Sequence, residues 1–275
     1  MTRAALLQMT GGIDPAANAR VVADAVREAR GLRAAMLFTP EMTNLIDRDR
    51  ERAAESIAAE ADDVVLARAR EAAGEHGVWV HLGSLAVRRE DGRLANRGFV
   101  IDDRGAVRAR YDKLHLFDVD LPTGERWRES AAYAPGGAAA VVDTPIGPLG
   151  LSICYDLRFP ALYQALSGAG ATLLAVPSAF TRPTGQAHWE TLLRARAIEN
   201  AAFVVAAAQT GTHEDGRATW GRSMVVDPWG EMLLDMGDAP RVAAVDLEMD
   251  RIAEVRARLP VLAHRRAIPP VERAA

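Results

Sequence analysis

The fold is decided by one stretch, Pro148-Leu-Gly-Leu-Ser-Ile-Cys154-Tyr-Asp-Leu-Arg-Phe-Pro160-Ala-Leu-Tyr-Gln-Ala-Leu166. Residues 149–153 are short, apolar and bounded by Gly and Pro, which predicts a buried strand. Pro160 fits the first turn of a helix, where its missing N–H costs nothing, and apolar side chains follow it at helical spacing. Cys154, the single cysteine, therefore lies where a strand ends and the chain turns toward a helix.

Cys154 has two interpretations at this point. Reactive nucleophiles are presented at such turns, and a nearby helix N-terminus favours the thiolate. A lone cysteine beside a strand of small residues is also commonly a buried packing residue. The stretch alone leaves both open.

Composition limits the class of protein. Of the 275 residues, 49% are hydrophobic and 25% charged, which is typical of a soluble globular protein. The net charge of -4 gives no electrostatic case for a nucleic-acid or membrane partner. No apolar run reaches membrane-spanning length, and residues 4–9 are too short for a signal-peptide core.

The single cysteine permits no intrachain disulfide, so a reducing compartment, the cytoplasm, is expected. Motifs for zinc, a metalloprotease helix or a phosphate loop do not occur in the sequence. No metal and no cofactor are therefore expected.

An internal duplication is the main architectural indication. The order strand, helix, strand, helix, strand, hairpin occurs twice, and local resemblances such as residues 35–40 with 172–177 keep that order. The first half has predicted strands at 4–9, 34–38, 78–87, 98–101 and 106–110, a helix at 15–32, and a second helix through 64–71 that ends near 74. The second has strands at 149–153, 172–176, 203–208, 223–226 and 231–234, and helices at 160–167 and 188–200.

The duplication predicts a layered fold. Strands this apolar need cover on both faces, whereas the helices carry one apolar stripe each. Two halves stacked sheet to sheet satisfy both, so we expect a four-layer α-β-β-α sandwich with a pseudo-twofold axis. No Pro-, Gly- or Ser-rich linker separates the halves, which predicts a single domain over residues 1–275. A last helix is expected at 247–259, with a tail from about 260 at an oligomer interface.

Three residues of functional type follow predicted strands: Glu41, Lys113 and Cys154. Ligands of open α/β sheets bind beyond the carboxyl ends of strands, so a pseudo-twofold could bring the three into one cleft. This set suits acyl transfer. Cys154 would attack a carbonyl, Glu41 would take the thiol proton and later activate water, and Lys113 with the N–H of Tyr155 would stabilise the oxyanion.

The rival arrangement is a Cys–His pair, with His115 or His188 as the base. An exposed Glu or Lys is also often only a solvated charge. Spacing in the sequence leaves these alternatives open.

Three segments resemble the signature segments of the nitrilase superfamily of carbon–nitrogen hydrolases, and the resemblance covers nearly the whole chain. They are residues 40–41 (Pro-Glu), 111–117 (Tyr-Asp-Lys-Leu-His-Leu-Phe) and 150–160 (Gly-Leu-Ser-Ile-Cys-Tyr-Asp-Leu-Arg-Phe-Pro). The resemblance implies an α-β-β-α sandwich, with Glu41 as general base, Lys113 as oxyanion-side lysine and Cys154 as nucleophile. It also implies that Glu129 positions Lys113 and the substrate.

Within the superfamily, residues 154–160 are similar to the branch that holds omega-amidase and deaminated-glutathione amidase. Residues 194–199, 206–213 and 223–230 are closer to the latter. The implied reaction is hydrolysis of deaminated glutathione to 2-oxoglutarate and Cys-Gly. The alternatives are an omega-amidase acting on 2-oxoglutaramate, another small-amide or N-carbamoyl hydrolase, and a scaffold without activity.

Both amidase substrates carry a 2-oxo-carboxylate. The resemblance implies that Arg158 and Thr184 hold that group, with Tyr155 beside the substrate, and an Arg fork suits a planar carboxylate. The alternative for Arg158 is a structural ion pair with Asp156 or with a surface glutamate.

Arg182 and His213 are further candidates, for contacts with a longer substrate. The resemblance also implies a homodimer or higher homo-oligomer acting on a small-molecule amide.

Overall fold

The computed structural model describes residues 2–120, 124 and 126–273. Side chains alternate along its first strand, β1 (Thr2–Gln8), as the pleat requires. Ala4 and Leu6 face the core between two sheets, whereas Ala5 and Leu7 pack beneath helices. Because both faces of the strand are buried, its sequence is a nearly continuous run of apolar residues.

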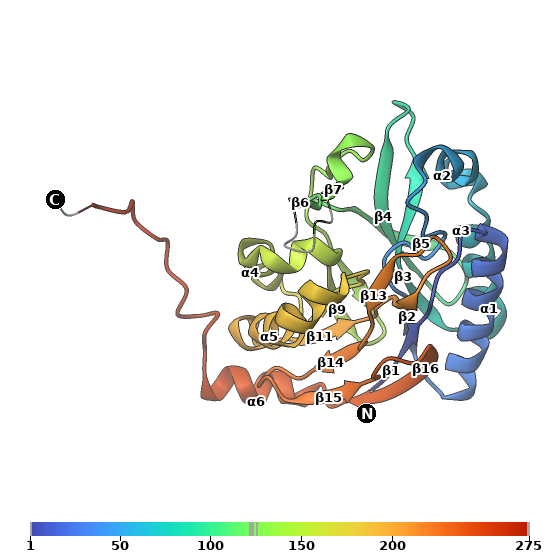
Figure 1. Ribbon diagram of the computed structural model, residues 1–275. Helices are drawn as coiled ribbons and strands as arrows, with labels where there is room; N and C mark the ends of the chain where they lie inside the picture. Colours follow the sequence, from blue (N-terminus) through green and yellow to red (C-terminus); the bar gives the residue numbers. More distant parts are fainter. Residues whose placement is uncertain (1, 121–123, 125, 274–275) are drawn as a thin grey trace.

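The first sheet has the strand order β16-β1-β2-β3-β4-β5. Strands β1, β2 and β3 are parallel, and the others join antiparallel. Two helices cover its outer face (Figure 1), and each begins at an aspartate that caps its first turn. The bounds are α1 (Pro15–Gly31), β2 (Met36–Phe38), α3 (Val64–His76), β3 (Trp79–Arg88), β4 (Leu94–Ile101), β5 (Val107–Asp112) and β16 (Arg241–Leu247).

The second sheet has the order β15-β14-β11-β10-β9-β8. Strands β9, β10 and β11 repeat the parallel arrangement of β1, β2 and β3, and an antiparallel edge strand again flanks the first of them. The predicted duplication is confirmed. The bounds are β8 (Val141–Thr144), β9 (Gly147–Leu151), α4 (Pro160–Gly168), β10 (Leu173–Ala175), α5 (Arg182–Asn200), β11 (Phe203–Ala206), β14 (Met224–Val226) and β15 (Met232–Asp235).

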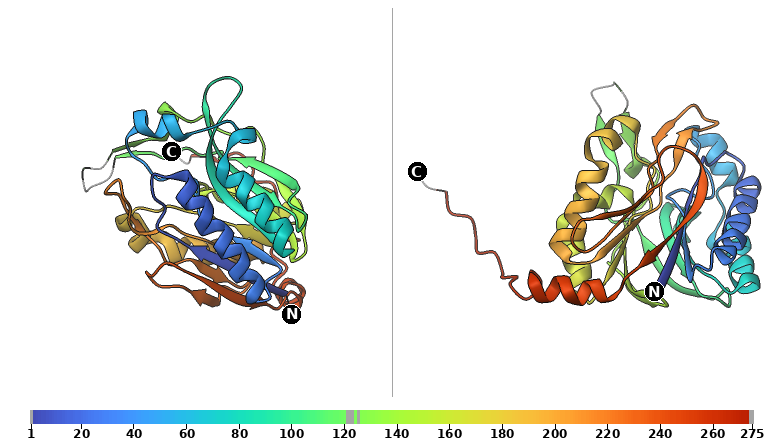
Figure 2. Two further views of the ribbon diagram at one scale, coloured as in Figure 1. Left: turned by 90° about the vertical axis from the view of Figure 1, so that its right-hand side faces the viewer. Right: turned by 90° about the horizontal axis from the view of Figure 1, so that it is seen from below.

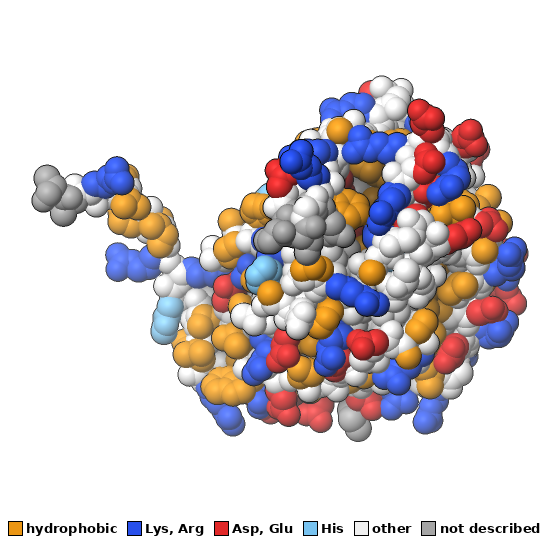
Figure 3. All heavy atoms as spheres, in the orientation of Figure 1, with side chains coloured by type: hydrophobic (Ala, Val, Ile, Leu, Met, Phe, Trp, Pro, Cys, Tyr) orange, Lys and Arg blue, Asp and Glu red, His pale blue; other side chains and the backbone are white. Residues whose placement is uncertain are grey.

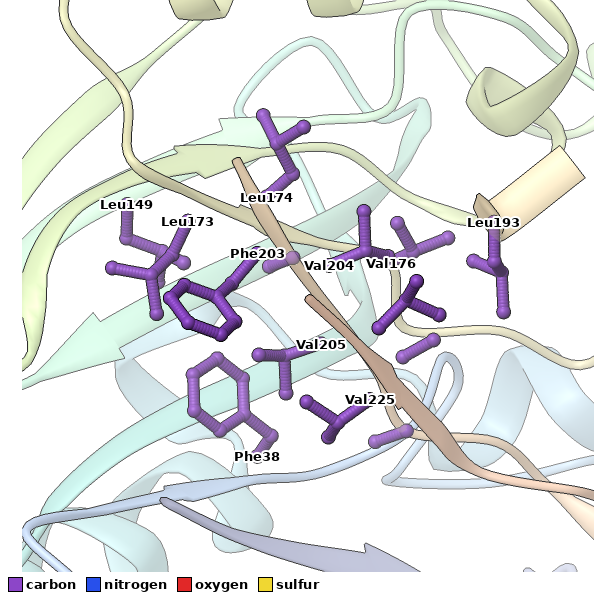
Figure 4. Close-up of a cluster of buried hydrophobic side chains, with 14 of the residues drawn as sticks. Phe38, Leu149, Leu173, Leu174, Val176, Leu193, Phe203, Val204, Val205 and Val225 are labelled. Atoms are coloured by element: carbon purple, nitrogen blue, oxygen red, sulfur yellow. The ribbon is translucent and has the colours of Figure 1, made fainter. Parts of the chain in front are cut away.

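The two sheets pack face to face, with α1 and α3 outside one and α4 and α5 outside the other (Figure 2). Phe38 of the first sheet lies among Phe203, Val205 and Val225 of the second in one buried cluster (Figure 4). The α-β-β-α sandwich is therefore confirmed, and the carboxyl ends of its parallel strands converge at one end of the molecule.

Several elements differ from the sequence expectations. Helix α5 begins at Arg182 rather than 188, because Pro183 suits a first helical turn. Leu247 ends β16, where it pairs with Thr2, so the last helix is α6 (Asp250–Arg258). The sequence did not predict β16, β8 or the short elements α2 (Arg50–Ser56), η1 (Glu60–Asp62), β6 (Asp118–Asp120), β7 (Arg126–Arg128), η2 (Glu129–Ala131), η3 (Cys154–Arg158), β12 (Thr210–Thr212) and β13 (Ala218–Trp220).

The chain beyond α6 extends away from the sandwich (Figures 1 and 2). Arg265 anchors its first part by donating to the carbonyl of Gln164 at 2.9 Å. Within the described ranges, no helix combines the length and the apolar character needed to cross a membrane.

Candidate active site

Cys154 lies directly beyond β9, as the first residue of η3. Its φ of +50° is in the left-handed region, which a residue with a side chain rarely adopts outside functional turns. Two hydrogen bonds fix the turn: the Cys154 N–H donates to the carbonyl of Pro177 at 2.9 Å, and the Ile153 N–H donates to the Asp156 carboxylate at 2.9 Å. The strained conformation is thus held by its surroundings.

Asp156 ties this turn to the chain that follows β5. Its buried carboxylate accepts hydrogen bonds from the Tyr111 hydroxyl at 2.7 Å and the His115 N–H at 3.0 Å, and His115 Nδ1 lies 2.7 Å from Oδ1. These partners occupy Asp156, so the suggested ion pair between Asp156 and Arg158 is wrong. His115 is likewise engaged with Asp156.

Glu41 lies just beyond β2 and is 4% exposed. Its Oε1 accepts from Lys113 Nζ at 2.8 Å and from Asn96 Nδ2 at 3.0 Å, and its Oε2 accepts from the N–H of Ala179 at 2.9 Å. Glu41 and the Cys154 thiol line the same cavity, and the charge of this carboxylate raises the pKa of the thiol. The carboxylate therefore joins the two halves of the sandwich at one point.

The loop that carries Glu41 is held tightly. A Cβ at Gly83 would lie 2.1 Å from the carbonyl oxygen of Thr39, so only glycine allows this approach of strand and loop. Met42, the next residue, has φ of +54° and donates its N–H to the Ser84 hydroxyl at 3.0 Å. Like Cys154, Glu41 is thus displayed at a strained turn.

Lys113 follows β5 and bridges two carboxylates. Besides Glu41, its Nζ donates to Glu129 Oε2 at 2.9 Å and Oε1 at 3.2 Å. Glu129 also accepts from the Phe117 N–H at 2.7 Å and from Asn96 Nδ2 at 3.0 Å. Lys113 is only 2% exposed, so its ammonium group is stabilised by these partners rather than by water.

The pKa values of the three central groups follow from this arrangement. Burial alone would raise the pKa of Glu41, but the Lys113 charge and hydrogen bonds from Cys154, Lys113 and Asn96 lower it. Burial would lower the pKa of Lys113, but Glu129 and Glu41 raise it. Burial and the Glu41 charge raise the pKa of the Cys154 thiol.

The resting site is therefore a carboxylate, an ammonium group and a neutral thiol. Burial and the Glu41 charge thus favour the neutral thiol over the thiolate that the helix beginning at Pro160 was expected to favour.

A cavity of about 670 Å³ opens beside these groups. It falls in the range of roughly 300–1,000 Å³ found for small-molecule sites. The residues that we assigned to catalysis and to binding of the 2-oxo-carboxylate line it, namely Glu41, Lys113, Glu129, Cys154, Tyr155, Arg158 and Thr184.

The other candidates lie elsewhere. In the described part of the chain, His115, His188, Arg182 and His213 are not among the cavity-lining residues. His188 Nδ1 lies 3.3 Å from Arg158 Nη1, and His213 is buried, 2.9 Å from the carbonyl of Gly11 and 2.8 Å from the Thr219 hydroxyl.

Arg158 presents its guanidinium group between two aromatic rings. Its central carbon lies 5.4 Å from the ring centre of Phe180 and 5.9 Å from that of Tyr155. These rings orient the arginine without neutralising it. Thr184 stands on the same wall, with its hydroxyl 2.9 Å from that of Thr181.

Asn96 and Arg217 belong to the site but were not predicted from the sequence. Asn96 lies in the largely apolar strand β4 and donates to the carboxylates of Glu41 and Glu129. A polar residue within a buried strand is the sequence feature that could have indicated its role. Arg217 reaches the cavity from the β12–β13 hairpin, which had no counterpart in the first half and was not predicted.

The family model "Carbon-nitrogen hydrolase" matches residues 3–257, and the chain belongs to this family. Its fold and site thus define a hydrolase that acts on carbon–nitrogen bonds other than peptide bonds.

Individual relatives are similar over much of their length. The chain is 46% identical over 202 residues to a deaminated glutathione amidase of Yersinia enterocolitica, covering 72% of this chain and 71% of the relative. It is 40% identical over 270 residues to a deaminated glutathione amidase of Bos taurus, covering 95% and 81%. The crystal structure of the C. elegans NitFhit protein superposes with a TM-score of 0.87 at 40% identity, covering 96% of this chain and 65% of that one.

Proposed function

We propose that this protein is a thiol amidase that hydrolyses deaminated glutathione to 2-oxoglutarate and Cys-Gly through an acyl-enzyme on Cys154. The observation that carries the proposal is the buried set of Cys154, Glu41 and Lys113 at one cavity, with Lys113 and Asn96 donating to Glu41. The names of the relatives from Yersinia and Bos supply the substrate.

Acylation begins at the neutral thiol. Cys154 Sγ attacks the amide carbon as its proton moves to Glu41, which makes a buried sulfur nucleophilic without a stable thiolate. The oxyanion that forms lies against the Lys113 ammonium group and the backbone N–H of Tyr155. When the C–N bond breaks, the leaving amine takes the proton from Glu41.

Deacylation repeats these roles with water. Glu41 removes a proton from a water molecule that attacks the thioester carbon, and the second tetrahedral intermediate is stabilised by the same donors. Collapse releases the 2-oxo acid and returns the proton to Cys154. Glu129 keeps Lys113 in place throughout, because it binds the same ammonium group through both oxygens.

Arg158 and Thr184 bind the 2-oxo-carboxylate of the substrate. The guanidinium group of Arg158 has aromatic rings near it and presents donors to the cavity. A bidentate pair with a carboxylate would complete its hydrogen bonds.

The test is a comparison of kcat/KM for deaminated glutathione, 2-oxoglutaramate and an N-carbamoyl amino acid, with Cys154→Ala as the inactive control. We expect deaminated glutathione to be preferred at least about tenfold, the ratio that one good polar contact supplies. A preference for 2-oxoglutaramate would make the protein an omega-amidase. Turnover by Cys154→Ala at the wild-type rate would exclude an acyl-enzyme intermediate on Cys154.

The chain also forms one carbon–nitrogen hydrolase domain over residues 1–275, in this proposal. The buried cluster that contains Phe38 and Phe203 is shared by both halves, so neither half retains its core alone. A single cooperative unfolding transition is expected, and two separate transitions would contradict it.

A homodimer or higher homo-oligomer in the cytoplasm is the proposed working form. The chain beyond α6 exposes Leu259, Ile268 and Val271, which suits contact with a second copy. A reducing compartment keeps Cys154 as a thiol. Ultracentrifugation of the full chain and of a chain ending at residue 259 tests the assembly, with loss of the oligomer expected in the shorter chain.

A further inference from the structure

The β12–β13 hairpin carries one arginine, Arg217, into the cavity beside Cys154. The turn of this hairpin is fixed by short hydrogen bonds: the His213 N–H donates to the Arg217 carbonyl at 2.7 Å, and the Arg217 N–H donates to Asp215 at 2.8 Å. The buried His213 ring anchors the same turn to Gly11. The backbone at Arg217 is therefore held in place by these hydrogen bonds.

The guanidinium group of Arg217 is nearly enclosed. Its side chain is 16% exposed, and its central carbon lies 4.8 Å from the ring centre of Trp127, which also lines the cavity. The buried Nε atom of Arg217 has no hydrogen-bond partner among the described residues. An enclosed donor of this kind is costly unless a ligand or water accepts from it.

The charge around Arg217 is unbalanced. Its Nη2 lies 3.3 Å from Asp215 Oδ2, and Arg48 Nε lies 3.9 Å from the same oxygen. The nearby carboxylate of Asp47 is engaged by Arg52 at 2.6 Å and 2.8 Å. Since two guanidinium groups share Asp215, this end of the cavity keeps a positive charge.

The other cavity arginines have clearer structural partners. Arg128 donates to both oxygens of Asp120 at 2.9 Å, Arg50 donates to the Arg128 carbonyl at 2.8 Å, and Arg88 donates to the Ala54 carbonyl at 2.9 Å. Basic side chains gather over the region of α2, β4 and β7 (Figure 3). Among the described cavity arginines, only Arg158 and Arg217 place the guanidinium group against an aromatic ring.

Arg158 and Arg217 stand on different walls. Arg158 belongs to η3 and contacts Phe180, whereas Arg217 belongs to the β12–β13 hairpin and contacts Trp127 of β7. Glu41, Arg158 and Arg217 all line the one cavity. Since the proposed function assigns Arg158 to the carboxylate of the acyl part, Arg217 on the other element remains for an anion of the leaving amine.

We propose that Arg217 binds a second carboxylate, carried by the leaving amine, so that the cavity selects amides with a carboxylate on each side of the scissile bond. This inference rests on the proposed function. It assigns to Arg217 the selectivity for a peptide-like amide over a small primary amide. A substrate without the distal carboxylate leaves the enclosed Nε of Arg217 without a hydrogen-bond acceptor, which disfavours its binding.

The test uses two ligands that differ only at the distal group: deaminated glutathione and its C-terminal carboxamide. Calorimetry on Cys154→Ala measures binding without turnover. We expect the carboxylate ligand to bind about 10- to 100-fold more tightly than the carboxamide, the range for charge-assisted hydrogen bonds. Adding Arg217→Met should abolish that difference, and Arg217→Lys should restore part of it.

Arg126→Met is the matched control, since this cavity arginine is 79% exposed and should leave the ratio unchanged. Equal affinity of the two ligands for Cys154→Ala, equal losses of both in Arg217→Met, or no binding of either ligand would overturn the inference. Failure of the proposed function has a different signature. The carboxylate preference in binding would then persist while the wild-type enzyme fails to hydrolyse deaminated glutathione.

Discussion

The two halves of the sandwich differ most where they correspond most closely. Ala4 pairs with Met36 in the first half, and Leu149 pairs with Leu173 in the second. Five residues beyond each of these positions lie Met9 and Glu41 in the first half, and Cys154 and Ser178 in the second. In the proposed mechanism, the first half therefore supplies the base Glu41 and has Met9 at the position of the nucleophile. The second half supplies the nucleophile Cys154 and has Ser178 at the position of the base.

This difference shows how two similar halves of the sandwich form a single site. Both halves end their strands toward the same region, but each contributes only part of the chemistry. The loop after β10 still serves the first half, because the Ala179 N–H donates to Glu41 at 2.9 Å. Neither half is a site alone.

The largest effect is expected from removing the nucleophile of the second half. Cys154→Ala should lower kcat by about 10⁴-fold or more, as losses of catalytic nucleophiles do elsewhere. Met9→Leu changes the corresponding position of the first half and should preserve activity, since volume-conserving core changes cost little. Steady-state assays, with circular dichroism to verify folding, measure both. Comparable losses of kcat in Cys154→Ala and Met9→Leu would contradict the claim that only the second half supplies the nucleophile.

A somewhat smaller effect is expected from the base of the first half. Glu41→Gln keeps the shape but cannot accept the thiol proton, so kcat should fall by about 10²- to 10⁴-fold. Ser178→Ala, at the corresponding position, should change kcat less than about threefold. An active Glu41→Gln enzyme would assign the base to another residue.

Asn96 extends the comparison of the two halves, because its side-chain amide donates to both Glu41 and Glu129. Asn96→Leu removes donors to both carboxylates, and hydrogen bonds to charged groups contribute enough for a loss of about 10- to 100-fold in kcat. KM should change little, since Asn96 is buried behind the carboxylates and is not a cavity-lining residue. A rise in KM with unchanged kcat would instead place Asn96 in substrate binding.

The smallest effect concerns Arg158, on the second-half wall. Arg158→Met should raise KM for 2-oxo-acid amides by about tenfold with little change in kcat, because an exposed ion pair contributes modestly. An amide that lacks the 2-oxo-carboxylate should be hydrolysed equally by wild type and variant. Equal losses on both substrates would show that Arg158 is structural.

Local patterns in the sequence were sufficient for the layers and for Glu41, Lys113 and Cys154, whereas Glu129, Arg158 and Thr184 were predicted from the family resemblance. Apolar runs predict buried strands, and the strand ends place Glu41, Lys113 and Cys154 at one edge. Strand β16 was not predicted, because its pairing with β1 joins residues at opposite ends of the chain. Asn96 and Arg217 depend on contacts across sheets and hairpins, which no local period encodes.

The protonation of Cys154 also lay beyond the sequence. A turn toward a helix suggested a thiolate, but burial and Glu41 raise the thiol pKa in the folded protein. The sequence likewise could not separate Glu41 from His115 as the base, because that choice depends on what Asp156 and Cys154 contact in space.

The pH dependence of kcat/KM tests the central claim most directly, namely that Glu41 of the first half is the base for Cys154 of the second. A glutamate normally titrates near about 4.3 and a histidine near about 6.5. Since the Glu41 pKa is lowered and the Lys113 pKa is raised, both groups keep their working charge from pH 5 to 8. We predict a flat profile over that range. A profile that falls tenfold per pH unit below an apparent pKa near 6.5 would contradict the account and assign the base to a histidine.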